Sequence, residues 1–103
     1  MNKLGISRYS KNPIIKKEDV LFKVNSIFNP GAVKYKDKYI LLCRVEMPIG
    51  RSSLVIAESK DGFNFKVNVK PILTPDDHKN YYEYVKWGIE DARITQIGKI
   101  FYL

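Results

Sequence analysis

Two adjacent carboxylates and an arginine stand near the end of the chain, in the segment WGIEDARIT at residues 87–95. They are Glu90, Asp91 and Arg93, and the residues around them favour a β-strand. Charged residues are depleted in strands, and burying them without partners costs free energy. Because successive side chains of a strand point to opposite faces, we expect Asp91 and Arg93 on one face and Glu90 on the other.

A second predicted strand, LLCRVEM at residues 41–47, carries a similar pattern. Arg44 and Glu46 share one face, whereas Cys43 belongs to the opposite, apolar face. In each strand an acid and a base thus lie at positions i and i+2, about 6.6 Å apart along the strand, so their tips can converge on one small polar molecule. The alternative is that these pairs are cross-strand ion pairs on a solvated face, which is the usual role of charges on strands.

Short strands and turns account for most of the chain from residue 28 onward. No window shows an apolar period of 3.6 residues, and Asp61-Gly62 and Gly98 mark tight turns, so the sequence predicts an all-β fold. The predicted strand segments are GAVKYKDKYILLCRVEM (31–47, two strands about a turn at 36–38), SSLVIAES (52–59), KVNVKPIL (66–73) and IEDARITQIGKIFYL (89–103, two strands about Gly98). The remaining segment, TPDDHKNYYEYVKW (74–87), is predicted to be a loop.

Two segments share a pattern of strand, tight turn and apolar strand. NPGAVKYKDKYILL (29–42) can be set above EDARITQIGKIFYL (90–103) at an offset of 61 residues, which matches Lys38 to Lys99. A repeat of this length suits a blade of a β-propeller, and the chain then holds fewer than two blades of a fold that needs about four or more. We therefore expect an N-terminal part of a longer propeller protein. Residues 1–27 would lead into the first blade, and residues 28–103 would form about one and a half blades.

Composition narrows the classes of function. The 103 residues carry a formal net charge of +7, but 14 of the 18 basic residues are lysines scattered along the chain. A nucleic-acid site usually clusters its basic residues and uses more arginine, so we expect no nucleic-acid partner. Cys43 is the only cysteine, which excludes an intrachain disulfide, and no apolar run is long enough to cross a bilayer. The sequence predicts a cytoplasmic protein without a membrane partner.

Three stretches resemble glycoside hydrolase family 130: FNPGAVKYKDKYILLCRVE, RSSLVIAESKDGFNF and WGIEDARIT. The resemblance covers residues 28–103, and its most specific element is GIEDARIT, which is similar to the family's Gly-x-Glu-Asp-Pro-Arg signature. Here Ala92 stands where proline is frequent. The family contains β-mannoside phosphorylases and β-1,2-mannosidases on a five-bladed β-propeller. The resemblance therefore implies an enzyme that acts on β-mannosides, by inverting phosphorolysis, with transfer of the mannosyl group to phosphate, or by hydrolysis.

The resemblance also implies roles for individual residues. Asp91 matches the general acid, and the resemblance implies that its proton passes through the sugar's 3-hydroxyl to the glycosidic oxygen. Asn29 and Arg44 match positions that bind the sugar in the −1 subsite, a role that suits the directional hydrogen bonds of amide and guanidinium groups. From the residues alone, Asn29 could also be a turn residue before Pro30-Gly31, and Arg44 a structural ion pair.

Three further residues are candidates for substrate binding. They are Glu46, Glu90 and Arg93, and the division of roles between Glu90 and Arg93 stays open. We expect no cofactor, with inorganic phosphate as a co-substrate if the enzyme is a phosphorylase. A single histidine, His78, provides no metal-binding constellation, so no metal site is expected.

Two other classes of function stay open. One is a propeller fragment that binds carbohydrate without catalysis, and the other is a basic module that binds single-stranded nucleic acid through aromatic stacking. We also expect the fragment alone to be inactive. It should self-associate, because fewer than two blades leave strand edges unpaired.

Overall fold

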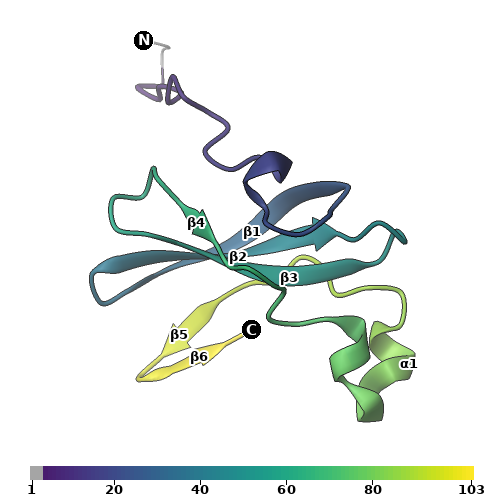
Figure 1. Ribbon diagram of the computed structural model, residues 1–103. Coiled ribbons are helices and arrows are strands. Elements are labelled where there is room, and N and C mark those ends of the chain that lie inside the picture. Colours follow the sequence, from purple (N-terminus) through teal and green to yellow (C-terminus); the bar gives the residue numbers. More distant parts are fainter. Residues whose placement is uncertain (1–3) are drawn as a thin grey trace.

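A computed structural model describes residues 4–103. The chain is built on a four-stranded antiparallel sheet with strand order β1-β2-β3-β4, followed by a separate two-stranded sheet of β5 and β6 (Figure 1). The strands are β1 (Ser26–Tyr35), β2 (Lys38–Glu46), β3 (Ser52–Ser59), β4 (Lys66–Val67), β5 (Thr95–Ile97) and β6 (Ile100–Tyr102). The helical turns are η1 (Lys17–Asp19), η2 (Pro75–Asp77), η3 (Lys79–Tyr81) and α1 (Tyr82–Val85). The predicted β architecture is confirmed, and β3 has the predicted bounds.

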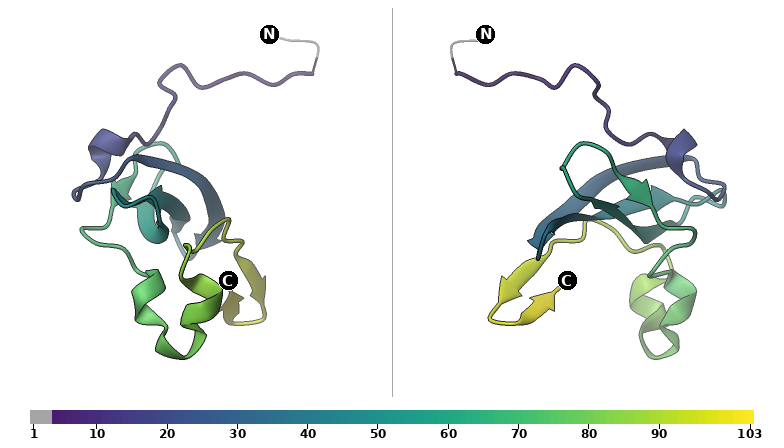
Figure 2. Two further views of the ribbon diagram at one scale, coloured as in Figure 1. Left: turned by 90° about the vertical axis from the view of Figure 1, so that its right-hand side faces the viewer. Right: turned by 60° about the vertical axis from the view of Figure 1, so that its left-hand side comes forward.

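One face of the four-stranded sheet forms the buried core. β-Branched and small side chains alternate toward it along β2 and β3, as a half-buried sheet requires. The buried members are Cys43, Val45, Val55, Ala57 and Val67, with Val20 from the segment before β1. Figure 2 shows this segment on one side of the sheet, with β5 and β6 on the other. The predicted domain boundary at residue 28 stays a prediction.

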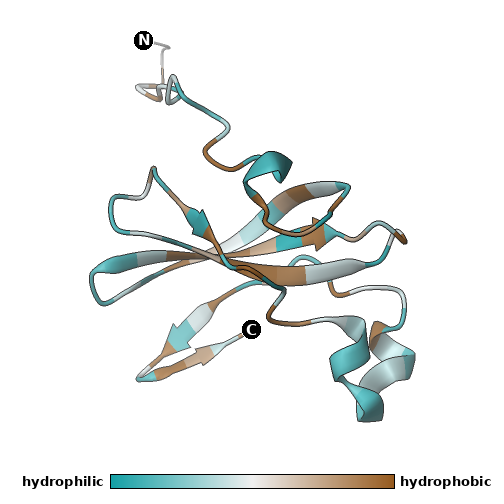
Figure 3. Ribbon diagram, viewed as in Figure 1, coloured by the Kyte–Doolittle hydropathy of each residue, from teal (hydrophilic) through white to brown (hydrophobic). Residues whose placement is uncertain are grey.

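The opposite face of the sheet has two parts. Arg44 lies on it, as the alternation with Cys43 and Val45 predicts, because Cys43 and Val45 are buried in the core. Toward the other end of the strands, this face is apolar. It borders a hollow of about 310 Å³ that includes Leu42, Ile56 and, from β6, Phe101. Figure 3 shows hydrophobic residues concentrated where β2 and β3 run through the centre of the sheet.

A β-bulge interrupts β1. Phe28 pairs with Arg44 and Gly31 pairs with Leu42, so two residues of β1, Asn29 and Pro30, stand opposite one residue of β2. Asn29 has a φ of +43°, and Pro30 has no N–H to offer the ladder. Bulges are a place where strands accept proline and where a side chain is redirected. The bulge therefore frees the Asn29 side chain from the regular alternation of β1.

Residues 74–94 depart from the predictions in two ways. The segment predicted to be a loop contains three short helical turns, η2, η3 and α1. The strand predicted from residue 89 begins only at Thr95, and residues 88–94 have irregular backbone. Gly88 and Asp91 have φ values of +132° and +48°, which an extended strand does not contain. The prediction of a strand at Glu90 and Asp91 is therefore wrong.

The internal repeat is present, but its offset is 62 residues rather than 61. Asn29 and Asp91 both have left-handed backbone, and so do Lys36 and Gly98 in the two hairpin turns; each pair is 62 residues apart (29 to 91 and 36 to 98). Lys38, previously matched to Lys99, begins β2, whereas Lys99 lies in the turn before β6. Backbone conformation reveals the alignment because a turn position requires a particular φ but accepts several residue types.

No helix among residues 4–103 has the length and apolar character that spanning a membrane would require.

Candidate active site

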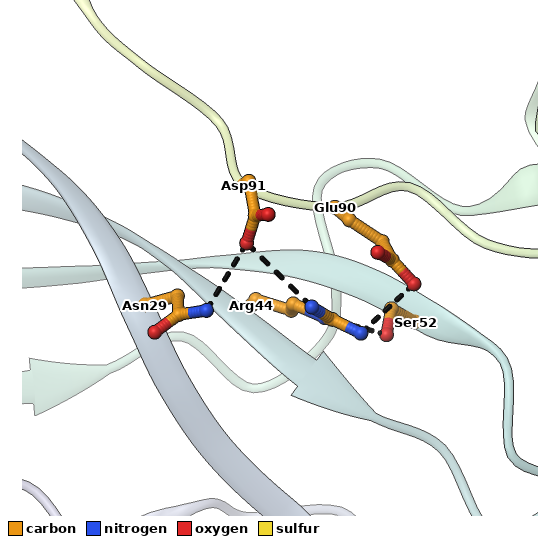
Figure 4. Close-up of polar contacts among 5 residues, drawn as sticks. All are labelled: Asn29, Arg44, Ser52, Glu90 and Asp91. Carbon is orange, nitrogen blue, oxygen red and sulfur yellow. Dashed lines mark hydrogen bonds and ion pairs between the residues drawn. The ribbon is translucent and has the colours of Figure 1, made fainter.

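Five polar side chains meet where the irregular segment before β5 passes the bulge of β1, the end of β2 and the start of β3 (Figure 4). They come from β1, β2, β3 and the segment itself. This group is called the acid–arginine cluster, and its members are Asn29, Arg44, Ser52, Glu90 and Asp91.

Arg44 is the centre of the cluster. Its Nε donates a hydrogen bond to Ser52 Oγ at 2.8 Å, and its Nη2 donates to Glu90 Oε1 at 2.8 Å. Nη1 lies 3.5 Å from Asp91 Oδ1. The guanidinium also lies over the ring of Phe28, 4.6 Å from its centroid, a favourable cation–π geometry. With its side chain only 17% exposed, Arg44 is a partly buried base beneath two more exposed carboxylates.

The two oxygens of Asp91 have different surroundings. Oδ1 accepts a hydrogen bond from Asn29 Nδ2 at 3.1 Å and faces Arg44. Oδ2 has no hydrogen bond to any residue in the described range 4–103, and the side chain is 58% exposed. One oxygen is thus held in place, and the other is open toward a ligand. A group that exchanges a proton with a substrate needs this combination of orientation and access.

The backbone at Asp91 brings Glu90 and Asp91 to the same guanidinium. In a regular strand the two side chains would point to opposite faces, as predicted from the sequence. The φ of +48° at Asp91 breaks that alternation, so both carboxylates reach Arg44. The predicted separation of Glu90 from Asp91 is therefore wrong. Asp is one of the few residues that occupy this backbone region readily.

Two glycines allow the segment to lie close to the sheet. A Cβ on Gly31 of β1 would stand 2.7 Å from the carbonyl oxygen of Ala92, and a Cβ on Gly88 would stand 2.8 Å from the backbone nitrogen of Ser52. The Ile89 N–H also donates to the Ser52 carbonyl at 2.9 Å. The stretch between these contacts contains Glu90 and Asp91, so its position is fixed on both sides.

Two predicted site residues lie outside the cluster. Glu46 shares the Arg44 face of β2, but it accepts a hydrogen bond from Asn25 Nδ2 at 3.1 Å. Arg93 is exposed and has no hydrogen bond or ion pair within the described part of the chain. The structure thus brings together Asn29, Arg44, Glu90 and Asp91. It does not bring Glu46 and Arg93 into contact with them.

Sequence reasoning missed Ser52 and Phe28. Phe28 pairs directly with Arg44 in the ladder, and Ser52 lies two residues from Leu54, the other partner of Arg44. A buried serine in a strand of apolar residues is a signal for Ser52, because a buried hydroxyl needs a hydrogen-bond partner. That signal becomes specific only after the register between β2 and β3 is known.

The neighbouring helical segment is attached to the same side of the sheet. Arg51 pairs with Asp76 in η2 at 3.1 Å and donates to the carbonyl of Lys86 at 3.2 Å, so it fastens the segment near both ends. Trp87 and Tyr84 are exposed. Among residues 4–103, no group of three histidine, cysteine or acidic side chains is arranged to hold a metal ion.

The composition of the cluster suits a polar, uncharged ligand better than an anion. It holds one guanidinium and two carboxylates, so its formal charge is −1 when all three are ionised. Amide, guanidinium and carboxylate groups supply the directional donors and acceptors that sugar hydroxyls require. An anionic ligand would meet repulsion from Glu90 and Asp91, and its binding would need cationic groups from elsewhere.

Comparisons with known proteins agree with this chemistry. Residues 6–103 match the model of glycoside hydrolase family 130, described as beta-1,4-mannooligosaccharide phosphorylase. A beta-1,2-mannobiose phosphorylase of Listeria innocua is 46% identical over 52 residues, which are 50% of this chain and 13% of that protein. A 4-O-beta-D-mannosyl-D-glucose phosphorylase of Bacteroides fragilis is 38% identical over 78 residues, 72% of this chain and 20% of that protein.

The fold is shared with solved structures as well. The beta-1,2-mannobiose phosphorylase of Listeria innocua, solved in complex with beta-1,2-mannobiose, superimposes with a TM-score of 0.74 and 27% identity. The match covers 91% of this chain and 42% of the solved chain, so this chain spans less than half the length of the relatives it matches. The predicted partial five-bladed propeller is confirmed. The chain belongs to glycoside hydrolase family 130 and corresponds to its N-terminal portion.

Proposed function

We propose that this chain supplies the general acid and part of the −1 sugar site of an enzyme that phosphorolyses β-mannosides with inversion. The observation that carries the proposal is the geometry of Asp91. One carboxylate oxygen is held by Asn29 and faces Arg44, and the other is open. The names of the relatives favour phosphorolysis over hydrolysis.

In the proposed reaction, Asp91 provides the proton for the leaving oxygen through the sugar's 3-hydroxyl. The bond between the anomeric carbon and the glycosidic oxygen breaks, and its electron pair stays on that oxygen, which takes up the proton. An oxygen of inorganic phosphate forms the new bond to the anomeric carbon from the opposite face, so the product is a mannosyl phosphate of inverted configuration. The enzyme is thus a transferase of mannosyl groups as well as a glycosidase relative.

The other cluster residues would bind and orient. Asn29 would hold Asp91 and contact sugar hydroxyls, and Arg44 would bind the sugar from below. Glu90 forms the shortest carboxylate contact to Arg44, at 2.8 Å against 3.5 Å for Asp91. Glu90 would therefore balance the guanidinium charge, so that Asp91 is not its only counter-ion. Glu46 and Arg93 lie outside the cluster and would contact the sugar only after a substrate or further chain rearranges their surroundings.

Phosphate would be bound by groups outside the acid–arginine cluster. With Glu90 paired to Arg44, the cluster has no net positive charge to attract phosphate, whether or not Asp91 carries its proton. We propose that cationic residues elsewhere in the complete protein supply the phosphate site, with no other cofactor.

We also propose a cytoplasmic location and a first blade that starts at residue 28. The single buried cysteine supports the location, because it requires no oxidising compartment.

Incubation of the full-length protein that contains this chain with β-1,2- or β-1,4-mannobiose tests the proposal. We expect turnover that requires inorganic phosphate and releases mannose 1-phosphate, measured by chromatography of the products. Turnover without phosphate would replace phosphorolysis by hydrolysis. Binding of mannobiose without turnover in either condition would favour the non-catalytic carbohydrate-binding alternative. Salt-sensitive oligonucleotide binding without mannoside binding would favour the nucleic-acid alternative.

A further inference from the structure

We propose that Ser52 is a positioning residue that holds Arg44 and the Glu90–Asp91 segment in one arrangement. This inference rests on the proposed function, because it names what orients the sugar-binding arginine and the acid. Ser52 is the first residue of β3 and only 2% exposed. It belongs to neither charged motif of the sequence, and its side chain has no other hydrogen bond within residues 4–103.

Ser52 contacts both halves of the cluster through different atoms. Its Oγ accepts the Nε–H of Arg44 at 2.8 Å, and its carbonyl oxygen accepts the N–H of Ile89 at 2.9 Å. The absent side chain of Gly88 lets the segment approach the Ser52 backbone, since a Cβ there would stand 2.8 Å from the Ser52 nitrogen. One residue thus connects the arginine on β2 to the residue that immediately precedes Glu90.

The hydrogen bond to Nε determines which way the guanidinium faces. The planar group presents its donors in a fixed fork. When Nε is held by Ser52, Nη1 and Nη2 are left to meet Asp91 and Glu90. Without the Ser52 hydroxyl, the guanidinium of Arg44 can turn about the side-chain axis. It can then still contact one carboxylate, but it no longer contacts Glu90 and Asp91 together. The partly buried Nε–H would also lose its acceptor, which is costly for a charged donor.

The neighbouring serine offers a matched control. Ser53 is also 2% exposed, but it pairs with Val45 and so belongs to the core face of the sheet. Ser53→Ala removes the same chemical group from the same strand, but on the face away from the cluster. Ser52→Thr is the conservative variant, because it keeps an oxygen at the same position.

Kinetics of the full-length protein on mannobiose and phosphate provide the first readout. We expect Ser52→Ala to lower kcat/KM about 10-fold, the loss that one hydrogen bond to a charged group typically causes. Ser52→Thr should retain most of the wild-type value, and Ser53→Ala should leave it unchanged. Equal kcat/KM for the wild type and Ser52→Ala would overturn the proposal.

A double-mutant cycle separates positioning from a merely structural role. In an Arg44→Lys background there is no Nε to hold, so the additional loss from Ser52→Ala should fall to less than about twofold. If Ser52→Ala costs the same factor in both backgrounds, Ser52 does not act through Arg44 and the proposal is wrong. Thermal unfolding of all variants shows whether a change in stability accompanies either result.

A spectroscopic readout distinguishes failure of this inference from failure of the proposed function. The Arg44 Nε–H signal in a ¹⁵N-correlated NMR spectrum should exchange slowly with solvent in the wild type and Ser52→Thr, and rapidly in Ser52→Ala. This measurement needs no activity. A protected signal in a protein that turns over no mannoside would reject the proposed function but retain the Ser52 contact. An unprotected signal in an active wild type would reject the Ser52 inference alone.

Discussion

The bulge of β1 and the segment before β5 occupy equivalent places in two successive repeats. Asn29 and Asp91 both have left-handed backbone and lie 62 residues apart. In the first repeat this backbone presents an amide, and in the second it presents a carboxylate, and the two side chains meet at 3.1 Å. The same local geometry, used twice, therefore brings a hydrogen-bond donor and an acid together across the boundary between repeats.

The difference between the two repeats lies in what supports that geometry. The first is a bulge inside a ten-residue strand whose sheet carries the buried core. The second is irregular backbone followed by two three-residue strands that are mostly exposed. The acid therefore depends on the first repeat, through Arg44 and Gly31, for its position. A rigid element that orients a residue on an irregular segment is a common arrangement in active sites.

The largest expected effect on turnover comes from replacing Asp91 by asparagine, the residue at the equivalent position 29 of the first repeat. Asp91→Asn in the full-length protein keeps the size of the side chain and can still accept a hydrogen bond from Asn29, but it removes the proposed proton donor. We expect turnover of mannobiose to fall about 10²–10⁴-fold, with mannobiose affinity changed much less. Asp37→Asn, in the exposed turn after β1, is the control and should turn over normally. Wild-type turnover by Asp91→Asn would remove the acid role.

Cys43 tests the buried core that supports the first repeat. Desolvation by burial raises the pKa of the Cys43 thiol from 9.0 to about 11. Between those values the unfolded thiol has lost its proton while the folded one retains it, so the free energy of unfolding falls as pH rises from about 9 to 11. The loss amounts to roughly 2–3 kcal/mol. Urea unfolding should show a steeper decline in this range for the wild type than for Cys43→Ala, and parallel curves would contradict it.

The dependence of the second repeat on the first is tested at Gly31. In Gly31→Ala the new methyl group would stand 2.7 Å from the Ala92 carbonyl oxygen, so the segment carrying Asp91 must move. We expect kcat/KM to fall about 10-fold, because a displaced acid loses its alignment with the substrate, and stability to fall by about 1–3 kcal/mol from overpacking. Gly50→Ala adds backbone strain at a φ of +86° but meets nothing within 4 Å. Gly50→Ala should lower stability without changing kcat/KM. Equal kcat/KM for the two variants would show that the contact between Gly31 and Ala92 does not position Asp91.

The smallest effect concerns the exposed hairpin of the second repeat. Residues 1–103 alone are expected to self-associate weakly, because within residues 4–103 β5 and β6 pair only with each other, and β6 borders an apolar hollow. Light scattering should give an average mass that rises with concentration. Ile97→Lys, at a side chain that is 64% exposed, should reduce this rise. A monodisperse monomer across the concentration range would show that the open edges do not pair.

Local patterns were sufficient for much of the fold. Alternation predicted β3 with its bounds, the turn between β1 and β2, and the turn at Gly98. It also placed Cys43 and Arg44 on opposite faces. It failed at Glu90 and Asp91, because apolar residues on both sides imitate a strand while the φ of Asp91 breaks it. It also failed at residues 75–85, because the short helical turns there have no apolar period for a pattern to detect.

The residue types alone determined which chemistry is available: an acid at 91, a guanidinium at 44, an amide at 29, and a sheet whose alternation turns Arg44 away from the core. The tertiary structure decided which of them meet. Two departures from regular strand geometry, the bulge at Asn29 and the left-handed backbone of Asp91, aim side chains from different repeats at one point. Such departures are stabilised by contacts between segments distant in sequence, including Gly31 against Ala92 and Ser52 against Ile89, which local periodicity does not encode.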